Sequence, residues 1–510
     1  MTKAHSVPVH RFIKNLTSNW LALLVEVGIA FYLTPFIVKH LGLSTYGVWS
    51  LLNGLVGYLG LIDMGIRGGT GRYINLYLAK GEPDKVNQVI STSVVFLTIL
   101  SILVVGIASL LANYFLLIFP KTPSEMAGDI SNVLVIMSAN LWLAFLLAVY
   151  RGFINALERY DINNGIAIVF TLLRSFGILY VLDHGFGLKE MALVTTFANF
   201  FSLPFLLIAG KKLYPQLKLF SFGIHKERFL EIFKFGMGVF IARGGGQLNA
   251  YSHQLIIMWV LGPKFLGVFE MAMLLINNSI KLLETTQHVL YPRITKAGGL
   301  KDIASLRDIF LWQAKLTFFI GIGLFIGFIV YGKAFLDLWL GEHGQEAVSL
   351  LSIFSLAMLL SLFSSVSKMV LFGLGKVKVN IVFEYSYAII EVILILVGLQ
   401  LFGKSLEVFA FVALLDMSIG RGLIYTSFAI KQIKINAVKY FLFFGFRVLL
   451  CSMTTYWAFT EIHRFIAFQS WYGFFQSIII CIGLYVVIAI FTLLKISELK
   501  IVTGKLFNYA

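Results

Sequence analysis

The residues with the greatest capacity for chemistry lie between Arg243 and His288. In the apolar stretch 264–290, six residues follow one another at steps of four, three, four, three and four, and all but Leu274 are polar: Glu270, Leu274, Asn277, Lys281, Glu284 and His288. This spacing places them on one face of a helix. The opposite face is apolar, and an ionised group at the centre of a bilayer is costly. The stripe is therefore predicted to face protein or a water-filled cavity.

The preceding stretch, 233–261, carries a second polar face with Arg243, Gln247 and Gln254. Three consecutive glycines, Gly244, Gly245 and Gly246, follow the arginine and are predicted to let this helix bend. Together the two helices are predicted to form half of the lining of a polar central cavity.

The amino-acid composition is typical of a membrane protein. The 510 residues are 59% hydrophobic and only 13% charged, with a mean hydropathy of +0.87, and apolar runs of span length recur throughout the chain. The net charge of +16 is interpreted as basic cytoplasmic loops facing anionic lipid, and nucleic acid is not an expected partner. The two cysteines lie in apolar spans and predict neither a disulfide framework nor a metal site.

About fourteen membrane-spanning helices are predicted. They lie near 16–38, 45–66, 88–118, 130–153, 161–182, 189–209, 233–261, 264–290, 309–331, 346–373, 379–402, 406–429, 438–459 and 472–494. With the N-terminus inside, the predicted cytoplasmic segments hold 27 lysines and arginines and the outer loops hold 7. This asymmetry predicts that both termini are cytoplasmic.

A short repeat suggests how the spans are organised. Leu41, Gly42, Gly47 and Val48 recur 220 residues later as Leu261, Gly262, Gly267 and Val268, each set following a predicted span. Chance similarity of Leu/Gly-rich loops is the alternative to two six-helix lobes of the same topology. The predicted regions are an N-terminal lobe at 1–210, a basic cytoplasmic linker at 211–232, a C-terminal lobe at 233–430, and two additional helices with a cytoplasmic tail at 431–510.

Charged residues in the first lobe allow two interpretations each. Glu26 in the first span could carry a proton, bind a cation or pair with an arginine of a neighbouring helix. The glycine-rich run from Asp63 to Arg72 lacks the Gly-Lys-Ser/Thr ending of a phosphate loop and is interpreted as a flexible, basic cytoplasmic entrance. Arg67 and Arg72 would suit a pyrophosphate there, or would serve only as positive-inside anchors.

The other charged residues in or beside the spans are predicted to have structural roles. Arg174, Glu384, Glu391, Asp416, Arg421 and Arg447 lie in or beside spans, and the opposite signs favour structural pairing. No zinc-protease helix, nucleophile elbow or cluster of outer-loop carboxylates occurs in the sequence, so no catalytic residue and no metal site is assigned. The chain is interpreted as a transporter and not an enzyme.

The N-terminal sequence resembles polysaccharide-biosynthesis flippases of the MOP superfamily, which also contains MATE drug exporters and lipid II flippases. The resemblance is carried by Asn19-Trp20, Tyr46-Gly47-Val48-Trp49, Leu61-Ile62-Asp63-Met64-Gly65, Tyr291-Pro292-Arg293-Ile294, Leu336-Asp337-Leu338-Trp339-Leu340-Gly341 and Phe372-Gly373-Leu374-Gly375-Lys376. It is closest to the bacterial O-antigen and oligosaccharide-repeat-unit flippases.

The resemblance implies an all-α, MATE-like fold in a bacterial cytoplasmic (inner) membrane, with a V-shaped cavity and alternating access. The implied substrate is an undecaprenyl-pyrophosphate-linked oligosaccharide, moved to the outer leaflet. Membrane lipids, a polysaccharide polymerase and glycosyltransferases of the same pathway are the other implied partners. No cofactor is implied, and H⁺ and Na⁺ stay open as coupling ions.

Roles for individual residues follow as hypotheses. Arg243 and Lys281, with Arg67 or Arg72 at the inner mouth, would attract the pyrophosphate. The sugar hydroxyls are expected to bind Asn53, Gln247, Asn249, Asn277 and Asn278. Glu270 is a further residue of the predicted cavity. Glu26, Glu270 and Asp63 are the candidates for ion coupling.

Two other classes of protein are alternatives to the flippase. A MATE-type multidrug exporter would need an acidic, aromatic cavity. The basic residues of the polar stripe argue against such a cavity. An integral-membrane glycosyltransferase or ligase would need large outer loops with paired carboxylates, and the predicted loops are short.

Overall fold

The structure of the chain is a computed structural model that describes residues 9–63, 65–219, 223–288, 290–465 and 470–493. The side chains of residues 9–13, 16, 243, 285–288, 291 and 292 lie outside the described residues. Every regular element in the described ranges is helical. The predicted all-α class is therefore confirmed, and it has a simple cause: in lipid a helix satisfies its own backbone hydrogen bonds.

The chain divides into two compact units, Met1–Gly267 and Val268–Ala510. The first contains α1 (Val9–Gly60), α2 (Ile66–Ala79), α3 (Pro83–Ile118), α4 (Ala127–Ala156), α5 (Tyr160–Asp183), α6 (Leu188–Leu213) and α7 (Lys226–Val260). Helix α8 (Pro263–His288) begins in the first unit and continues into the second. The predicted lobe boundaries stay a prediction.

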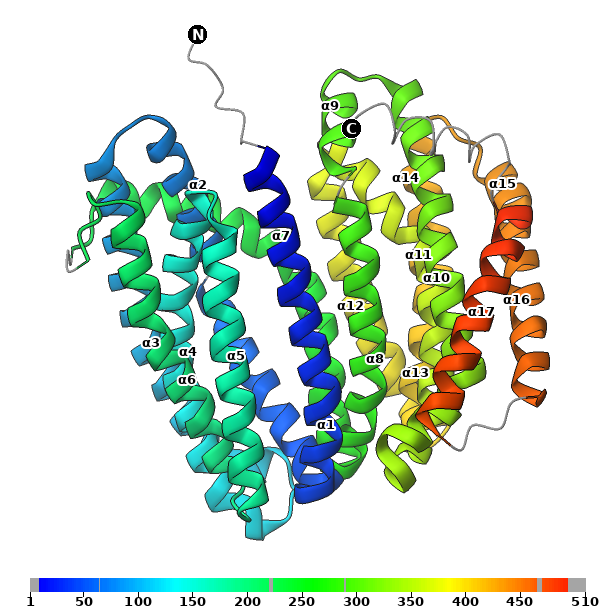
Figure 1. Ribbon diagram of the computed structural model, residues 1–510, viewed down its shortest axis with the longest axis horizontal. Helices are drawn as coiled ribbons and strands as arrows, with labels where there is room; N and C mark the ends of the chain where they lie inside the picture. The colour runs from blue at the N-terminus through cyan, green and yellow to red at the C-terminus, as the bar shows by residue number, and fades with distance from the viewer. Residues whose placement is uncertain (1–8, 64, 220–222, 289, 466–469, 494–510) are drawn as a thin grey trace. The chain divides into compact units, whose positions relative to one another are not determined.

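The second unit continues with α9 (Tyr291–Gly299), α10 (Ile303–Leu340), α11 (Val348–Gly373), α12 (Val377–Leu401), α13 (Leu406–Leu415), α14 (Thr426–Gln432), α15 (Ala437–Tyr440), α16 (Phe446–Phe465) and α17 (Trp471–Thr492). A π-helical segment, Asp416–Tyr425, joins α13 to α14, and a second, Phe441–Gly445, joins α15 to α16. Figure 1 shows the long helices of each unit running side by side.

Eleven helical stretches among the described residues are long and apolar enough to cross a membrane. Two of them, Thr17–Asp63 and Ile303–Gly373, contain 47 and 71 residues and each include two of the predicted spans. The predicted span 233–261, which carries Arg243 and three glycines, is not among the eleven. The multi-span character is thus confirmed, whereas the count of fourteen stays a prediction.

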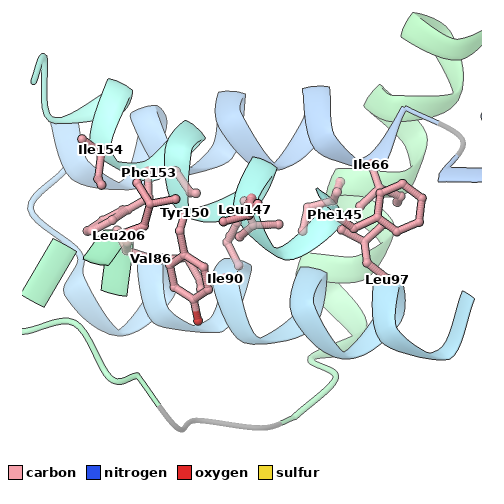
Figure 2. Packing of buried hydrophobic residues seen from close by; sticks show 14 of the residues in the cluster. Ile66, Val86, Ile90, Leu97, Phe145, Leu147, Tyr150, Phe153, Ile154 and Leu206 are labelled. Carbon is pink, nitrogen blue, oxygen red and sulfur yellow. The ribbon is translucent and has the colours of Figure 1, made fainter. Parts of the chain in front are cut away.

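The interior of the first unit is a continuous apolar core. Helix α4 packs against α3 and α6, and α2 packs against α3, α4 and α7. Figure 2 shows Phe145, Tyr150 and Phe153 of α4 meeting Leu97 of α3 and Leu206 of α6. Phe145 and Phe153 are fully buried. The close packing around them fixes the positions of the surrounding helices and of the polar residues at the helix ends.

The repeated glycines allow a turn and a close backbone contact in both copies of the repeat. Gly42 interrupts α1 with a φ of 76°, and Gly262 separates α7 from α8 with a φ of 100°. A Cβ added to Gly47 would clash with the carbonyl oxygen of Pro263, and one added to Gly267 would clash with that of Leu43. Each copy therefore lacks a side chain where the backbone of the other copy lies.

Candidate functional site

The polar stripe of α8 forms one face of the helix. Asn277, Lys281 and Glu284 are exposed and Glu270 is half-buried, while the residues of the opposite face are buried. Those buried residues are Met271, Ala272, Leu275, Ile276 and Leu283. The amide nitrogen of Asn278 is buried without a hydrogen-bond partner among the described residues. His288 has its side chain outside the described residues.

Helix α7 runs without interruption through Gly244, Gly245 and Gly246. The hinge function of these glycines stays a prediction. The side chain of Arg243 lies outside the described residues, and Gln247 and Asn249 are half-buried.

Further along α7, the polar face packs closely on α1. A Cβ on Gly57 would clash with the hydroxyl of Tyr251, and one on Gly54 would clash with the amide oxygen of Gln254. The rings of Tyr58 and Tyr251 lie 4.7 Å apart between centroids. On the same helix α1, Asn53 is exposed and donates its amide hydrogen to the carbonyl oxygen of Trp49 at 2.8 Å.

Asp63 connects α1 to α2. The residue is buried, and its carboxylate accepts the backbone N–H of Gly65 at 2.9 Å and forms an ion pair with Arg67. Gly65 has a φ of 71°, and a Cβ there would clash with the carbonyl oxygen of Gly236 on α7. Asp63 and Arg67 thus hold a tight turn, and the role of Asp63 in ion coupling stays a prediction.

The glycine-rich run after Asp63 forms helix α2 (Ile66–Ala79), so the predicted flexibility is wrong there, whereas its role as a cytoplasmic entrance stays a prediction. Its glycines allow close helix packing instead, since a Cβ on Gly69 would lie 2.5 Å from the carbonyl oxygen of Ile232. Arg67 and Arg72 are both exposed on this helix. The guanidinium of Arg72 lies 4.3 Å from the centroid of the Phe235 ring, and that of Arg67 lies 5.5 Å from the Phe145 ring.

A second polar contact fastens α2 to the beginning of α7. The hydroxyl of Tyr77 donates to Glu231 at 2.8 Å, and Arg228 donates to both Tyr77 and Glu231, the latter at 2.7 Å. Arg228 also pairs with Glu227 at 2.8 Å. Burial, reinforced by the hydrogen bond to Glu231, raises the pKa of Tyr77 to about 12, so the phenol is protonated at neutral pH.

The polar face of α1 contacts α5. Asn164 donates to Asn19 at 2.6 Å and to Ser18 at 3.1 Å, and Asn15 donates to the carbonyl oxygen of Glu158 at 3.0 Å. Glu26 interacts electrostatically with Arg174 of α5. Of the interpretations that the sequence left open for Glu26, this contact supports pairing with an arginine of a neighbouring helix.

The second unit contains a chain of ion pairs inside its spans. Lys368 of α11 pairs with Glu384 of α12 at 2.5 Å, Glu384 pairs with Arg421 at 3.4 Å, and Arg421 pairs with Asp416 at 2.8 Å. The structural pairing predicted for Glu384, Asp416 and Arg421 is confirmed. Lys368 was not singled out, because a lone lysine near the end of an apolar span looks like a cytoplasmic anchor.

The described residues contain no group of three or more His, Cys, Asp or Glu side chains that could hold a metal ion. Both cysteines are buried and free. The arrangement offers hydrogen-bonding amides, cations and carboxylates on helices of span length. Such groups can bind and release a polar or anionic molecule.

The fold is shared with transporters of known structure. The inward closed conformation of the lipid II flippase MurJ matches with a TM-score of 0.70 at 13% identity, covering 94% of this chain and 98% of that one. An inward-facing multidrug resistance MATE family transporter of the MOP superfamily matches with a TM-score of 0.65 at 14% identity, covering 81% and 95%. The chain therefore has the predicted MATE-like fold.

Sequence comparison identifies the family. The model of the polysaccharide biosynthesis protein family matches residues 12–297, which is more than half of the chain. The putative O-antigen transporter of Shigella flexneri is 20% identical over 374 residues, covering 72% of this chain and 86% of that protein. The uncharacterized membrane protein EpsK of Bacillus subtilis (strain 168) is 26% identical over 170 residues. The aligned part covers 33% of this chain and 33% of EpsK, so it spans a third of that relative's length.

These matches define a multi-pass membrane protein that shares its fold with transporters of the MOP superfamily. Within it, the chain belongs to the polysaccharide biosynthesis protein family. The family predicted from the short N-terminal and C-terminal motifs is thereby confirmed.

Proposed function

We propose that this protein moves an undecaprenyl-pyrophosphate-linked oligosaccharide from the inner to the outer leaflet of the bacterial cytoplasmic membrane by alternating access. The observation that carries the proposal is the polar face of α8, a helix of span length that keeps Asn277 and Lys281 exposed and Glu270 half-buried. Polar and charged groups within a span face protein partners or a water-filled path, and a path of this kind would admit a polar ligand. Family membership and the likeness to the putative O-antigen transporter support the same conclusion.

The proposed roles divide by charge. Arg243 and Lys281 attract the pyrophosphate, because a cation in a region of low dielectric constant binds phosphate strongly. The hydroxyl groups of the sugars bind the amides of Asn53, Gln247, Asn249, Asn277 and Asn278. Glu26, Glu270 or Asp63 takes up the H⁺ or Na⁺ that resets the transporter, and Gly244 to Gly246 let α7 bend.

An alanine substitution of Arg243 tests the proposal directly. We expect Arg243→Ala to reduce surface polysaccharide at least tenfold in cells that depend on this protein, because losing one charge-assisted contact to phosphate costs about 1.5–3 kcal/mol. Polysaccharide is measured by gel and immunoblot in cells with matched levels of the protein in the membrane.

Lys234→Ala is the matched control, since Lys234 is exposed at the beginning of the same helix. Undiminished polysaccharide in the Arg243→Ala strain would contradict the role of Arg243. If the wild-type protein instead conferred resistance to cationic drugs and did not restore polysaccharide, a MATE-type exporter would replace the proposed function.

A further inference from the structure

The crossing of α2 and α7 carries several cations, and most of them already have partners. Arg67 is paired with Asp63, and Arg228 donates to Tyr77, Glu231 and Glu227. Asp63 neutralises the charge of Arg67, and the buried Arg228 has two carboxylate partners. Neither therefore offers an uncompensated positive charge to a ligand.

Arg72 differs from both. Its side chain is exposed and forms no hydrogen bond or ion pair with any other described residue. Its guanidinium lies over the Phe235 ring of α7 at 4.3 Å and near the Tyr73 ring at 5.9 Å. A ring at this distance restricts the guanidinium plane and leaves its N–H groups at the edge available to an acceptor.

The surface next to Arg72 has few side chains. A Cβ on Gly71 or on Gly238 would meet nothing within 4 Å, and one on Gly68 would meet only the side chain of Val239, at 3.5 Å. The backbones of α2 and α7 are therefore accessible on either side of Phe235. A cation beside such a surface suits a ligand with an anionic head and an apolar or extended remainder.

Phe235 also places Arg72 in register with the predicted cavity. Residues 235, 239 and 243 follow one another at steps of four along the uninterrupted helix α7. Position 243 thus lies eight residues beyond Phe235, about 12 Å along the helix axis.

We propose that Arg72, stacked on Phe235, is the first receptor for the pyrophosphate of the lipid-linked substrate, and that Arg67 is a structural residue held by Asp63. The inference rests on the proposed function and assigns one of its steps, capture of the substrate before it enters the cavity. The planar fork of an arginine binds two phosphate oxygens at once, which a lysine cannot do. Charge alone is therefore insufficient at this position.

Binding of undecaprenyl pyrophosphate to the full-length protein in nanodiscs of zwitterionic lipid tests the assignment. We expect Arg72→Ala and Arg72→Lys each to weaken binding about tenfold, and Phe235→Leu to weaken it about threefold to tenfold by releasing the guanidinium. Lys234→Ala, which removes one exposed cation next to Phe235, should change binding less than about twofold. Unchanged melting temperatures confirm that the variants are folded.

Several outcomes would overturn the assignment. Arg72→Lys binding as tightly as the wild type would show that a point charge suffices, and equal losses in Arg72→Ala and Lys234→Ala would show non-specific attraction. Competition by phosphatidylglycerol as strong as that by undecaprenyl pyrophosphate would make the site one for bulk anionic lipid. Inorganic pyrophosphate should compete weakly, because it lacks the apolar remainder.

Failure of the inference can be distinguished from failure of the proposed function. If Arg72 variants bind and transport normally while Arg243→Ala abolishes surface polysaccharide, the function stands and the receptor is elsewhere. If the wild-type protein neither binds undecaprenyl pyrophosphate nor restores polysaccharide, the proposed function itself fails.

Discussion

Glu384 shows how a single residue can organise a membrane-embedded network. Its two carboxylate oxygens are shared between Lys368 and Arg421, and Arg421 continues the chain to Asp416, which is 3% exposed. Burying one such charge without a partner costs several kcal/mol, whereas a paired network can be tolerated. Arg421 also lies over the Tyr387 ring at 5.7 Å, which further restricts its position.

Glu384→Gln is expected to destabilise the second unit. The substitution preserves volume but removes the charge that neutralises Arg421 and Lys368, at a cost of about 2–3 kcal/mol after allowing for the partial exposure of Lys368. The measurement is the melting temperature in detergent, followed by size-exclusion chromatography with fluorescence detection. Glu461→Gln removes the partner of the exposed Arg464 and should cost less than about 1 kcal/mol. Equal melting temperatures for the two variants would contradict the structural importance of the network.

At the scale of elements, the glycine pair of the repeat brings two segments into backbone contact. The N-terminal copy passes from the first half of α1 to the second through Gly42, and the C-terminal copy passes from α7 to α8 through Gly262. Gly47 and Gly267 then lie against the backbone of the opposite copy. Chance similarity between two loops would not place matching residues in reciprocal contact, so the structure supports a true repeat.

Gly47→Ala is expected to destabilise the first unit although it adds only one methyl group. That group would overlap the carbonyl oxygen of Pro263, and relieving the clash should cost about 1–3 kcal/mol. Gly28→Ala is the control, because Gly28 lies in the same helix with nothing within 4 Å of an added Cβ. It should stabilise the protein by up to about 1 kcal/mol. Melting temperatures that shift in the same direction would show that the contact at Gly47 is looser than the structure indicates.

The elements that hydropathy and helical periodicity determine were predictable from the sequence. The spans and the amphipathic face of α8 appear in the structure because a helix in lipid satisfies its own backbone hydrogen bonds, and residues three and four apart share one helical face. Helix α2 was missed because glycine-rich segments are poor helix formers. Its close packing on Gly236 and Ile232 of α7 overcomes this propensity, and that contact is made by residues far away in the sequence.

The candidate site was predictable in its residue types but not in its partners. Asp416 and Arg421 are five residues apart and would not share a face of an α-helix, yet they pair because the chain is π-helical there. Likewise, the sequence does not show that Arg67 and Arg72 have different partners. Asp63 lies one helical turn before Arg67, and the ring that stacks on Arg72 belongs to α7.

At the scale of the whole molecule, the direction of transport depends on which ends of the helices face the cytoplasm. The excess of 27 lysines and arginines over 7 predicts that the loop at Lys80 is cytoplasmic and the loop at Lys404 is external. Both lysines are exposed, and both native cysteines are buried. The chain therefore offers a matched pair of labelling positions with a low background.

Lys404→Cys in a Cys451→Ala, Cys481→Ala background is expected to react with a membrane-impermeant maleimide in intact spheroplasts. Lys80→Cys should react only after the membrane is permeabilised, because its thiol would face the cytoplasm. Labelling is measured by a mass shift on a gel at equal protein levels. The reverse pattern would place Arg72 on the outer side, where a substrate made from cytoplasmic sugar nucleotides is not available for capture. It would thus remove both the proposed receptor and the proposed direction of transport, while leaving the fold unchanged.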